Sequence, residues 1–129
     1  MATSAAVFTP FIDQHTIALT TYRRDGTPVS TPVSIAVDGE RAFIRTWDTA
    51  GKMKRIRNNA DVTIAPSTWR GRVTGSAIRM RARVLDDTDA AAASRALARK
   101  YPLLHGIFVP LMHRLLSYKT IHLQLTPLN

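Results

Sequence analysis

The 129-residue sequence contains no cysteine. It can therefore form no disulfide, and it has neither a thiol nucleophile nor a thiolate metal site, which fits a reducing compartment. It also lacks an uninterrupted apolar run of about 18 residues, the length that a membrane-spanning helix needs. The N-terminal stretch has no basic region followed by a long apolar core, as a signal peptide would. These absences predict a cytoplasmic protein without a membrane span.

Acidic residues are scarce, since nine Asp and Glu stand against 18 Lys and Arg and give a formal net charge of +9. Such an excess of positive charge favours anionic partners. Nucleic acid, anionic lipid and phosphorylated small molecules all fit this charge. The length predicts one domain, which spans residues 1–129.

The common catalytic motifs are missing. The sequence contains no G-x-S-x-G elbow, no H-E-x-x-H zinc motif, no P-loop and no G-x-G-x-x-G. The four histidines are scattered, which is more typical of surface or packing roles than of a catalytic or metal site. We therefore predict neither a catalytic side chain nor a metal site.

Alternation of apolar and polar residues with a period of two is the dominant pattern. Residues 16–47 contain three strand-like runs separated by Asp25-Gly26 and Asp38-Gly39, dipeptides that are typical of tight hairpins. In the second run the small residues Ser30, Pro32, Ser34 and Ala36 lie on one face, so that a flat molecule could approach it. The prolines of this run predict an edge strand.

Three further strands are predicted at residues 61–66, 74–85 and 119–127. An alanine-rich helix is predicted at 86–102, with Asp86, Asp87 and Thr88 as capping candidates. The apolar stretch 103–116 is either deeply buried or covers a partner subunit. About six antiparallel strands with a few helices, and no βαβ rhythm, predict a mainly β fold closed into a barrel.

The stretch WDTAGKMKRIRNNADV, residues 47–62, places four cations directly after a polar turn that contains glycine. Met53 and Ile56 share one helix face, which predicts that the helix packs on the barrel. Lys52 falls in the first turn, where free backbone amides and the helix dipole favour an anion. The pattern predicts a phosphate site at Lys52, with Arg55 on the same side and Lys54 pointing away. The alternative is a solvated basic helix.

The order of a strand, an Asp-Gly hairpin, PVSTPV, a strand, DTAGKMKRIRNNADVTIAP and RGRVTG resembles the flavin/deazaflavin oxidoreductases. These are similar to the pyridoxamine-phosphate-oxidase-like, FMN-binding split β-barrels, and the likeness covers roughly residues 10–126. It is nearest the branch that uses coenzyme F420, a deazaflavin, with FMN as the alternative cofactor. The resemblance implies a homodimer with cofactor clefts between the subunits and hydride transfer to or from a small-molecule substrate.

The resemblance also implies which residues hold the cofactor. Lys52 matches the family's phosphate-binding lysine, and the turn that wraps the phosphate precedes it. Part of the second strand faces the ring, and the loop with Trp69 either closes over the partner's cofactor or lies in the core or interface. Pro32 and Ala50 stand where many relatives have an Asn or a second Arg. The implied cofactor-binding residues are Ser30, Thr31, Pro32, Thr46, Trp47, Thr49, Gly51, Lys52, Arg55, Trp69 and Arg70.

Two other functions stay open. A nucleic-acid-binding protein fits the charge, the basic helix and the alternating Arg79, Arg81 and Arg83. Aromatic residues that could stack on bases are few, however, and no RNP-like, helix-turn-helix or zinc signature is present, so we expect no specific nucleic-acid partner. A non-catalytic carrier of flavin, haem or another tetrapyrrole also fits, because a fold does not fix its chemistry.

Overall fold

The computed structural model describes residues 4–47, 51–101 and 120–128. The implied cofactor-binding residue Thr49 and the apolar stretch 103–116 lie outside this part of the chain. The described helices are α1 (Ser4–Val7), the 3-10 helix η1 (Thr9–Phe11), α2 (Gly51–Asn58) and α3 (Asp87–Lys100). The strands are β1 (Thr16–Tyr22), β2 (Pro28–Val33), β3 (Ala36–Asp38), β4 (Arg41–Trp47), β5 (Asp61–Ser67), β6 (Ile78–Val84) and β7 (Thr120–Pro127).

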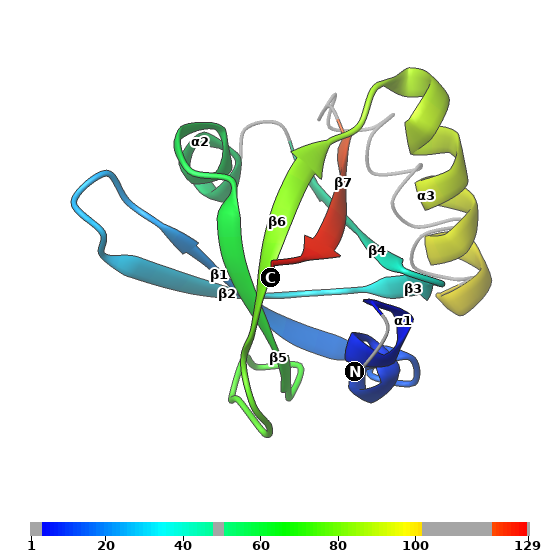
Figure 1. Cartoon of the computed structure of the whole chain (residues 1–129), viewed down its shortest axis with the longest axis horizontal. Helices are drawn as coiled ribbons and strands as arrows, with labels where there is room; N and C mark the ends of the chain where they lie inside the picture. Colours follow the sequence, from blue (N-terminus) through cyan, green and yellow to red (C-terminus); the bar gives the residue numbers. More distant parts are fainter. Residues whose placement is uncertain (1–3, 48–50, 102–119, 129) are drawn as a thin grey trace.

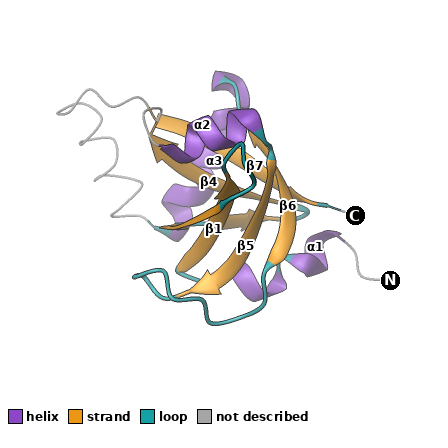
Figure 2. Ribbon diagram, turned by 90° about the vertical axis from the view of Figure 1, so that its left-hand side faces the viewer, coloured by secondary structure: helices purple, strands orange, loops and turns teal. Residues whose placement is uncertain are grey.

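All seven strands form one antiparallel sheet in the order β2-β1-β5-β6-β7-β4-β3. The sheet curls around its own apolar face, while α3 lies along its outside (Figure 1). Figure 2 shows α2 over one end of the curled sheet and the N-terminal helices at the other end. The predicted mainly β split barrel is therefore confirmed.

Helices close the two ends of the barrel with large apolar side chains. Phe8 and Phe11 from the N-terminal segment share one core cluster with Met53 and Ile56 from α2 and with the inward residues of the strands. The barrel interior is thus a packed core, and any ligand site has to lie on its rim or its outer face.

No helix in the described ranges is long and apolar enough to cross a membrane.

Both predicted hairpin turns are present. Gly26 has a φ of 89° and Gly39 a φ of 62°, in the left-handed region that glycine adopts at no steric cost. In the first turn the Asp25 carboxylate accepts a hydrogen bond of 2.9 Å from the amide of Thr27. This side-chain bond fixes the turn that carries Arg23 and Arg24.

The sheet has one strand more than the sequence predicts, because the second run splits into β2 and β3. The split lies at Ile35, whose amide donates to the Tyr101 hydroxyl at 3.3 Å. The carbonyl of Ile35 accepts hydrogen bonds from Lys100 Nζ at 2.7 Å and from the Tyr101 hydroxyl at 2.9 Å. Side chains from the end of α3 therefore take the place of a neighbouring strand at this residue.

The helix α3 begins as predicted. Asp86 has an extended backbone conformation, and its carboxylate accepts a hydrogen bond of 2.8 Å from the amide of Asp89. The helix buries Ala93, Ala96 and Leu97 in a second apolar cluster with Phe43 of β4. A side-chain cap and an apolar stripe thus position α3 against the outer face of the sheet.

Tyr101 joins three parts of the fold at the end of α3. Only 5% of the residue is exposed, and burial raises the pKa of its hydroxyl. Besides Ile35, the hydroxyl lies 2.8 Å from the carbonyl oxygen of His15, just before β1. The neighbouring Lys100 donates to the carbonyl of Phe11 at 3.2 Å. We call Lys100 and Tyr101 the α3 latch.

We predict that Tyr101→Phe lowers the free energy of unfolding by about 1–3 kcal/mol, because it leaves buried backbone groups without their partner. The matched control is Tyr22→Phe, since Tyr22 is half-exposed and its hydroxyl makes no hydrogen bond to the described residues. The control should change stability by less than about 0.5 kcal/mol. Urea unfolding of the three proteins checks this, and equal losses in both variants would contradict it.

A second polar cluster lies between the sheet and α3. Arg45 of β4 donates from Nε to Nε2 of His122 of β7 at 3.0 Å, and from Nη2 to the hydroxyl of Ser94 at 2.9 Å. Burial, and then the positive charge of Arg45, lower the pKa of His122 to about 4. The imidazole is therefore neutral at physiological pH and accepts a proton only if this arrangement changes.

We predict a loss of stability in mild acid that depends on His122. An unfolded imidazole titrates near 6.5, so between about pH 6.5 and 4 the unfolded chain binds a proton that the folded chain does not. Stability is complete above about pH 6.5 and falls by about 1–2 kcal/mol as the pH drops to 4, after allowance for partial exposure. His122→Gln keeps an acceptor but does not titrate. Urea unfolding at pH 7 and pH 4.5 should therefore give a smaller pH-dependent loss for the variant, and parallel losses would refute the assignment.

Candidate functional site

The helix α2 presents its cations because its apolar face is buried. Met53 is fully buried and Ile56 is 3% exposed, both in the barrel core. The predicted packing of this helix on the barrel is thus confirmed. The basic residues of α2 lie on the remaining faces, near the rim of the barrel.

Arg55 is held in place at the start of α2. Its Nε donates a hydrogen bond of 2.6 Å to the hydroxyl of Thr21, a fully buried residue of β1. A Cβ atom on Gly51 would lie only 3.1 Å from Nη1 of Arg55. The missing side chain at position 51 therefore leaves room for the guanidinium beside the first turn of the helix.

Lys52 lies half-buried in the same turn. Burial, and next the positive charge of Arg55, lower the pKa of its ammonium group. The described part of the chain supplies no hydrogen bond and no acidic partner for this group. A partly desolvated cation beside a second cation favours a bound anion, because the anion would neutralise both.

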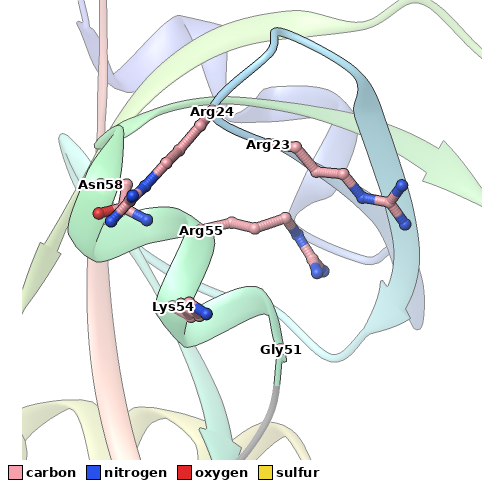
Figure 3. A pocket seen from close by; sticks show the side chains of 6 residues that line it. All are labelled: Arg23, Arg24, Gly51, Lys54, Arg55 and Asn58. Atoms are coloured by element: carbon pink, nitrogen blue, oxygen red, sulfur yellow. The ribbon is translucent and has the colours of Figure 1, made fainter.

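A pocket of about 380 Å³ lies between α2 and the turn that joins β1 to β2. Figure 3 shows how the cationic side chains from the two segments surround it. Of the six described residues that line it, four are cations and none is acidic. They are Arg23, Arg24, Gly51, Lys54, Arg55 and Asn58.

Lys52 does not line this pocket, whereas Lys54 does. The helical pattern of the sequence separates the two lysines but predicts no neighbours for Lys54. Arg23 and Arg24, which precede Lys54 by about 30 residues, are not predicted to lie near it. The one available signal was their place beside an Asp-Gly turn, which projects side chains from the end of a hairpin.

Two buried hydroxyl groups lack a hydrogen-bond partner among the described residues. They belong to Thr46 and Thr31, both implied cofactor residues. Thr46 lies near the end of β4 that leads towards α2 and is 6% exposed. Such unpaired hydroxyls are uncommon in folded proteins and cost free energy, so the one at Thr46, near the rim of the barrel, is available to hydrogen-bond a ligand.

The implied ring-facing segment divides between the two faces of β2. Thr31 is paired with Leu19, which points into the core, whereas Ser30 and Pro32 are exposed on the other face. Alternation along a strand requires this division. Only Ser30 and Pro32 therefore face a molecule outside the barrel.

The turn between β5 and β6 lies against β2. A Cβ atom on Gly71 would lie 3.7 Å from Cδ of Pro32. Trp69 in this turn is 70% exposed, and the guanidinium of Arg70 lies 4.7 Å from the centre of its ring. Within this chain Trp69 is thus not a core residue, and it is near the exposed part of the implied ring-binding segment.

The remaining implied residues are described in part or not at all. The structure gives the backbone of Trp47 at the end of β4, and Thr49 lies outside the described residues. Gly51, Lys52 and Arg55 come together in one helix turn, and Pro32 comes together with the turn of Trp69 and Arg70. The described residues include no group of three His, Asp or Glu side chains that could hold a metal ion.

The alternating arginines of β6 are largely engaged with acids. Arg81 lies 3.4 Å from the carboxylate of Asp61, and Arg83 lies 3.7 Å from that of Asp89. These ion pairs reduce the positive field along the strand. Arg79, the third of these arginines, has no ion pair with an acid among the described residues.

Solved structures share this fold. A conserved hypothetical protein from Mycobacterium tuberculosis is similar with a TM-score of 0.69 and 17% identity, over 100% of this chain and 83% of that one. A proposed pyridoxamine 5'-phosphate oxidase from Listeria innocua gives 0.66 and 11%, over 98% and 94% of the two chains. HutZ, the haem storage protein from Vibrio cholerae, gives 0.65 and 14%, over 90% and 83%. At these identities the likeness shows the fold alone.

Sequence comparison adds to this likeness. None of the curated proteins matches the chain. The sequence pattern of the family described as pyridoxamine 5'-phosphate oxidase matches residues 5–126. Because that match extends over nearly the whole chain and agrees with the curled antiparallel sheet, the protein belongs to the pyridoxamine 5'-phosphate oxidase family.

Proposed function

We propose that the protein is an oxidoreductase that binds coenzyme F420, a deazaflavin, and transfers a hydride between it and a small organic substrate. FMN is the alternative cofactor. The observation that carries the proposal is the half-buried Lys52, for which the described residues supply no hydrogen bond or acid, beside the fixed guanidinium of Arg55. When bound, the deazaflavin ring supplies the hydride chemistry, so the protein has to bind, orient and shield it.

The residues of α2 have the donor groups that a cofactor phosphate needs. Lys52 offers an ammonium group and Arg55 a guanidinium, at a helix start where backbone amides are free. The unpaired hydroxyl of Thr46 adds a donor near the end of β4 that leads towards this helix. In this proposal Trp47, Thr49 and Gly51 complete the turn around the phosphate.

The exposed face of β2 and the neighbouring turn would hold the ring. Ser30 and Pro32 present small side chains, and the turn with Trp69 and Arg70 lies beside them. An indole that is 70% exposed can cover a flat ring and exclude water from one of its faces. We propose that it does so across the interface of a homodimer, on the cofactor of the partner subunit.

The second candidate function is carriage of haem or another tetrapyrrole. The stacked pair of Trp69 and Arg70 supports it, because an indole and a guanidinium suit an aromatic macrocycle with carboxylate groups. The described histidines support it less. The Nε2 atom of His122 already accepts a hydrogen bond from Arg45, and His15 packs at 5.2 Å from the Tyr101 ring. We therefore rank this function second.

We predict that Lys52→Ala weakens deazaflavin binding by about 1.5–3 kcal/mol, the range for a charge-assisted hydrogen bond. Lys54→Ala should cost less than about 1 kcal/mol, like other exposed charges, because Lys54 faces the hairpin pocket. The turnover number at saturating cofactor should change little in either variant, because hydride transfer is the work of the ring. Fluorescence titration with the deazaflavin measures both affinities.

Equal and small losses in the two lysine variants would mean that α2 is only a diffuse basic surface.

The same titration with FMN and haem decides the cofactor. Deazaflavin should bind more tightly than either, and tighter haem binding would favour the carrier function instead.

We also predict a homodimer in solution. A cofactor ring on β2 needs a cover that the exposed Trp69 of a partner can supply. Light scattering at micromolar concentration should give about twice the chain mass of 14.3 kDa. A monomer mass would contradict both the dimer and the shared cleft.

A further inference from the structure

The pocket beside α2 is one end of a longer groove. It shares Arg23, Arg24 and Asn58 with a second hollow. That hollow shares Tyr22 and Asn59 with a third, which reaches Thr63 and Arg79 on the sheet. The three hollows therefore form a row of neighbouring depressions from the start of α2, past the first hairpin, to β6. We call it the hairpin groove.

The hairpin groove carries an excess of positive charge along its length. Arg23, Arg24, Lys54 and Arg55 line one end, and Arg79 lines the other. The one acid among the described residues that line it, Asp61, is paired with Arg81 at 3.4 Å. The Asp25 carboxylate of the adjacent turn is bonded to the amide of Thr27. Like charges repel across the groove, so a bound polyanion would relieve this repulsion.

The groove is separate from the Lys52 ammonium, since Lys52 lines none of its three hollows. One anionic group would satisfy Lys52, but it would leave the distant cations of the groove unpaired. An elongated groove with cations at both ends instead fits a chain of several anionic groups. Arginine predominates among these cations, and its planar guanidinium binds phosphate oxygens in pairs.

We propose that the hairpin groove binds a linear oligophosphate carried by a small molecule, as a second anion site that adjoins the phosphate site at Lys52 and shares Arg55 and Gly51 with it. The turn at Asp25 presents Arg23 and Arg24, and Thr21 fixes Arg55, so one end of the site is already arranged. Asn58 and Asn59 add amide donors between the two ends. This inference does not depend on the identity of the redox cofactor.

The backbone of a single-stranded nucleic acid offers the same phosphate groups. Binding such a strand usually combines a basic groove with several aromatic side chains that stack on successive bases. Among the described residues that line the three hollows, Tyr22 is the only aromatic one. The observations therefore favour a small molecule.

The test is calorimetric titration of the full chain with sodium tripolyphosphate in magnesium-free buffer. Arg24→Gln and Lys54→Gln should each raise the dissociation constant about three- to tenfold, because each removes one charge-assisted contact. Arg95→Gln removes the same charge outside the groove and should change it less than about twofold. All three residues are exposed, so thermal unfolding can verify that the variants are folded.

Failure of tripolyphosphate to bind, or equal losses in Arg24→Gln and Arg95→Gln, would overturn the proposal. Tighter binding of an oligothymidylate of eight nucleotides would assign the groove to nucleic acid and overturn the small-molecule ligand. A deazaflavin titration of Arg24→Gln separates this site from the cofactor site. Unchanged deazaflavin affinity with weakened tripolyphosphate binding supports two sites, whereas a parallel loss of both would mean that they are one.

Discussion

The fold depends on how the chain crosses from one edge of its sheet to the other. The two edge strands, β2 and β3, follow one another in sequence, so the residues between them have to close the curled sheet without strand partners. The backbone groups of Ile35 at this crossing are satisfied by the α3 latch. Barrel closure, the position of α3 and the start of β1 are therefore linked through one buried hydroxyl and one ammonium group.

The features that local sequence determines were predictable. Asp-Gly dipeptides indicate the two hairpins, Asp86 indicates the start of α3, and the spacing of Met53 and Ile56 indicates the buried face of α2. Each of these depends on contacts within a few residues. The division of the second run depends instead on Tyr101, which is 66 residues from Ile35. No local pattern reports such a contact.

The candidate site shows the same limit. The phosphate site at Lys52 could be predicted from the sequence, because it depends on a local feature, the position of this lysine in the first turn of a helix. The neighbours of Lys54 were not predictable, because Arg23 and Arg24 reach it only when the first hairpin folds beside α2. Burial of hydroxyls also follows from tertiary structure, so Thr31 and Thr46 could be assigned from the family resemblance but not recognised as unpaired.

The edges of the sheet also restrict how two copies of the chain can associate. Along β2, Pro28 and Pro32 have no amide hydrogen, and β3 is only three residues long. An incoming strand would therefore find few complementary groups at either edge, which protects the protein against edge-to-edge aggregation. Specific association is therefore left to the faces of the sheet and to the turns and helices around it, where the shape and charge of the side chains can select the correct partner.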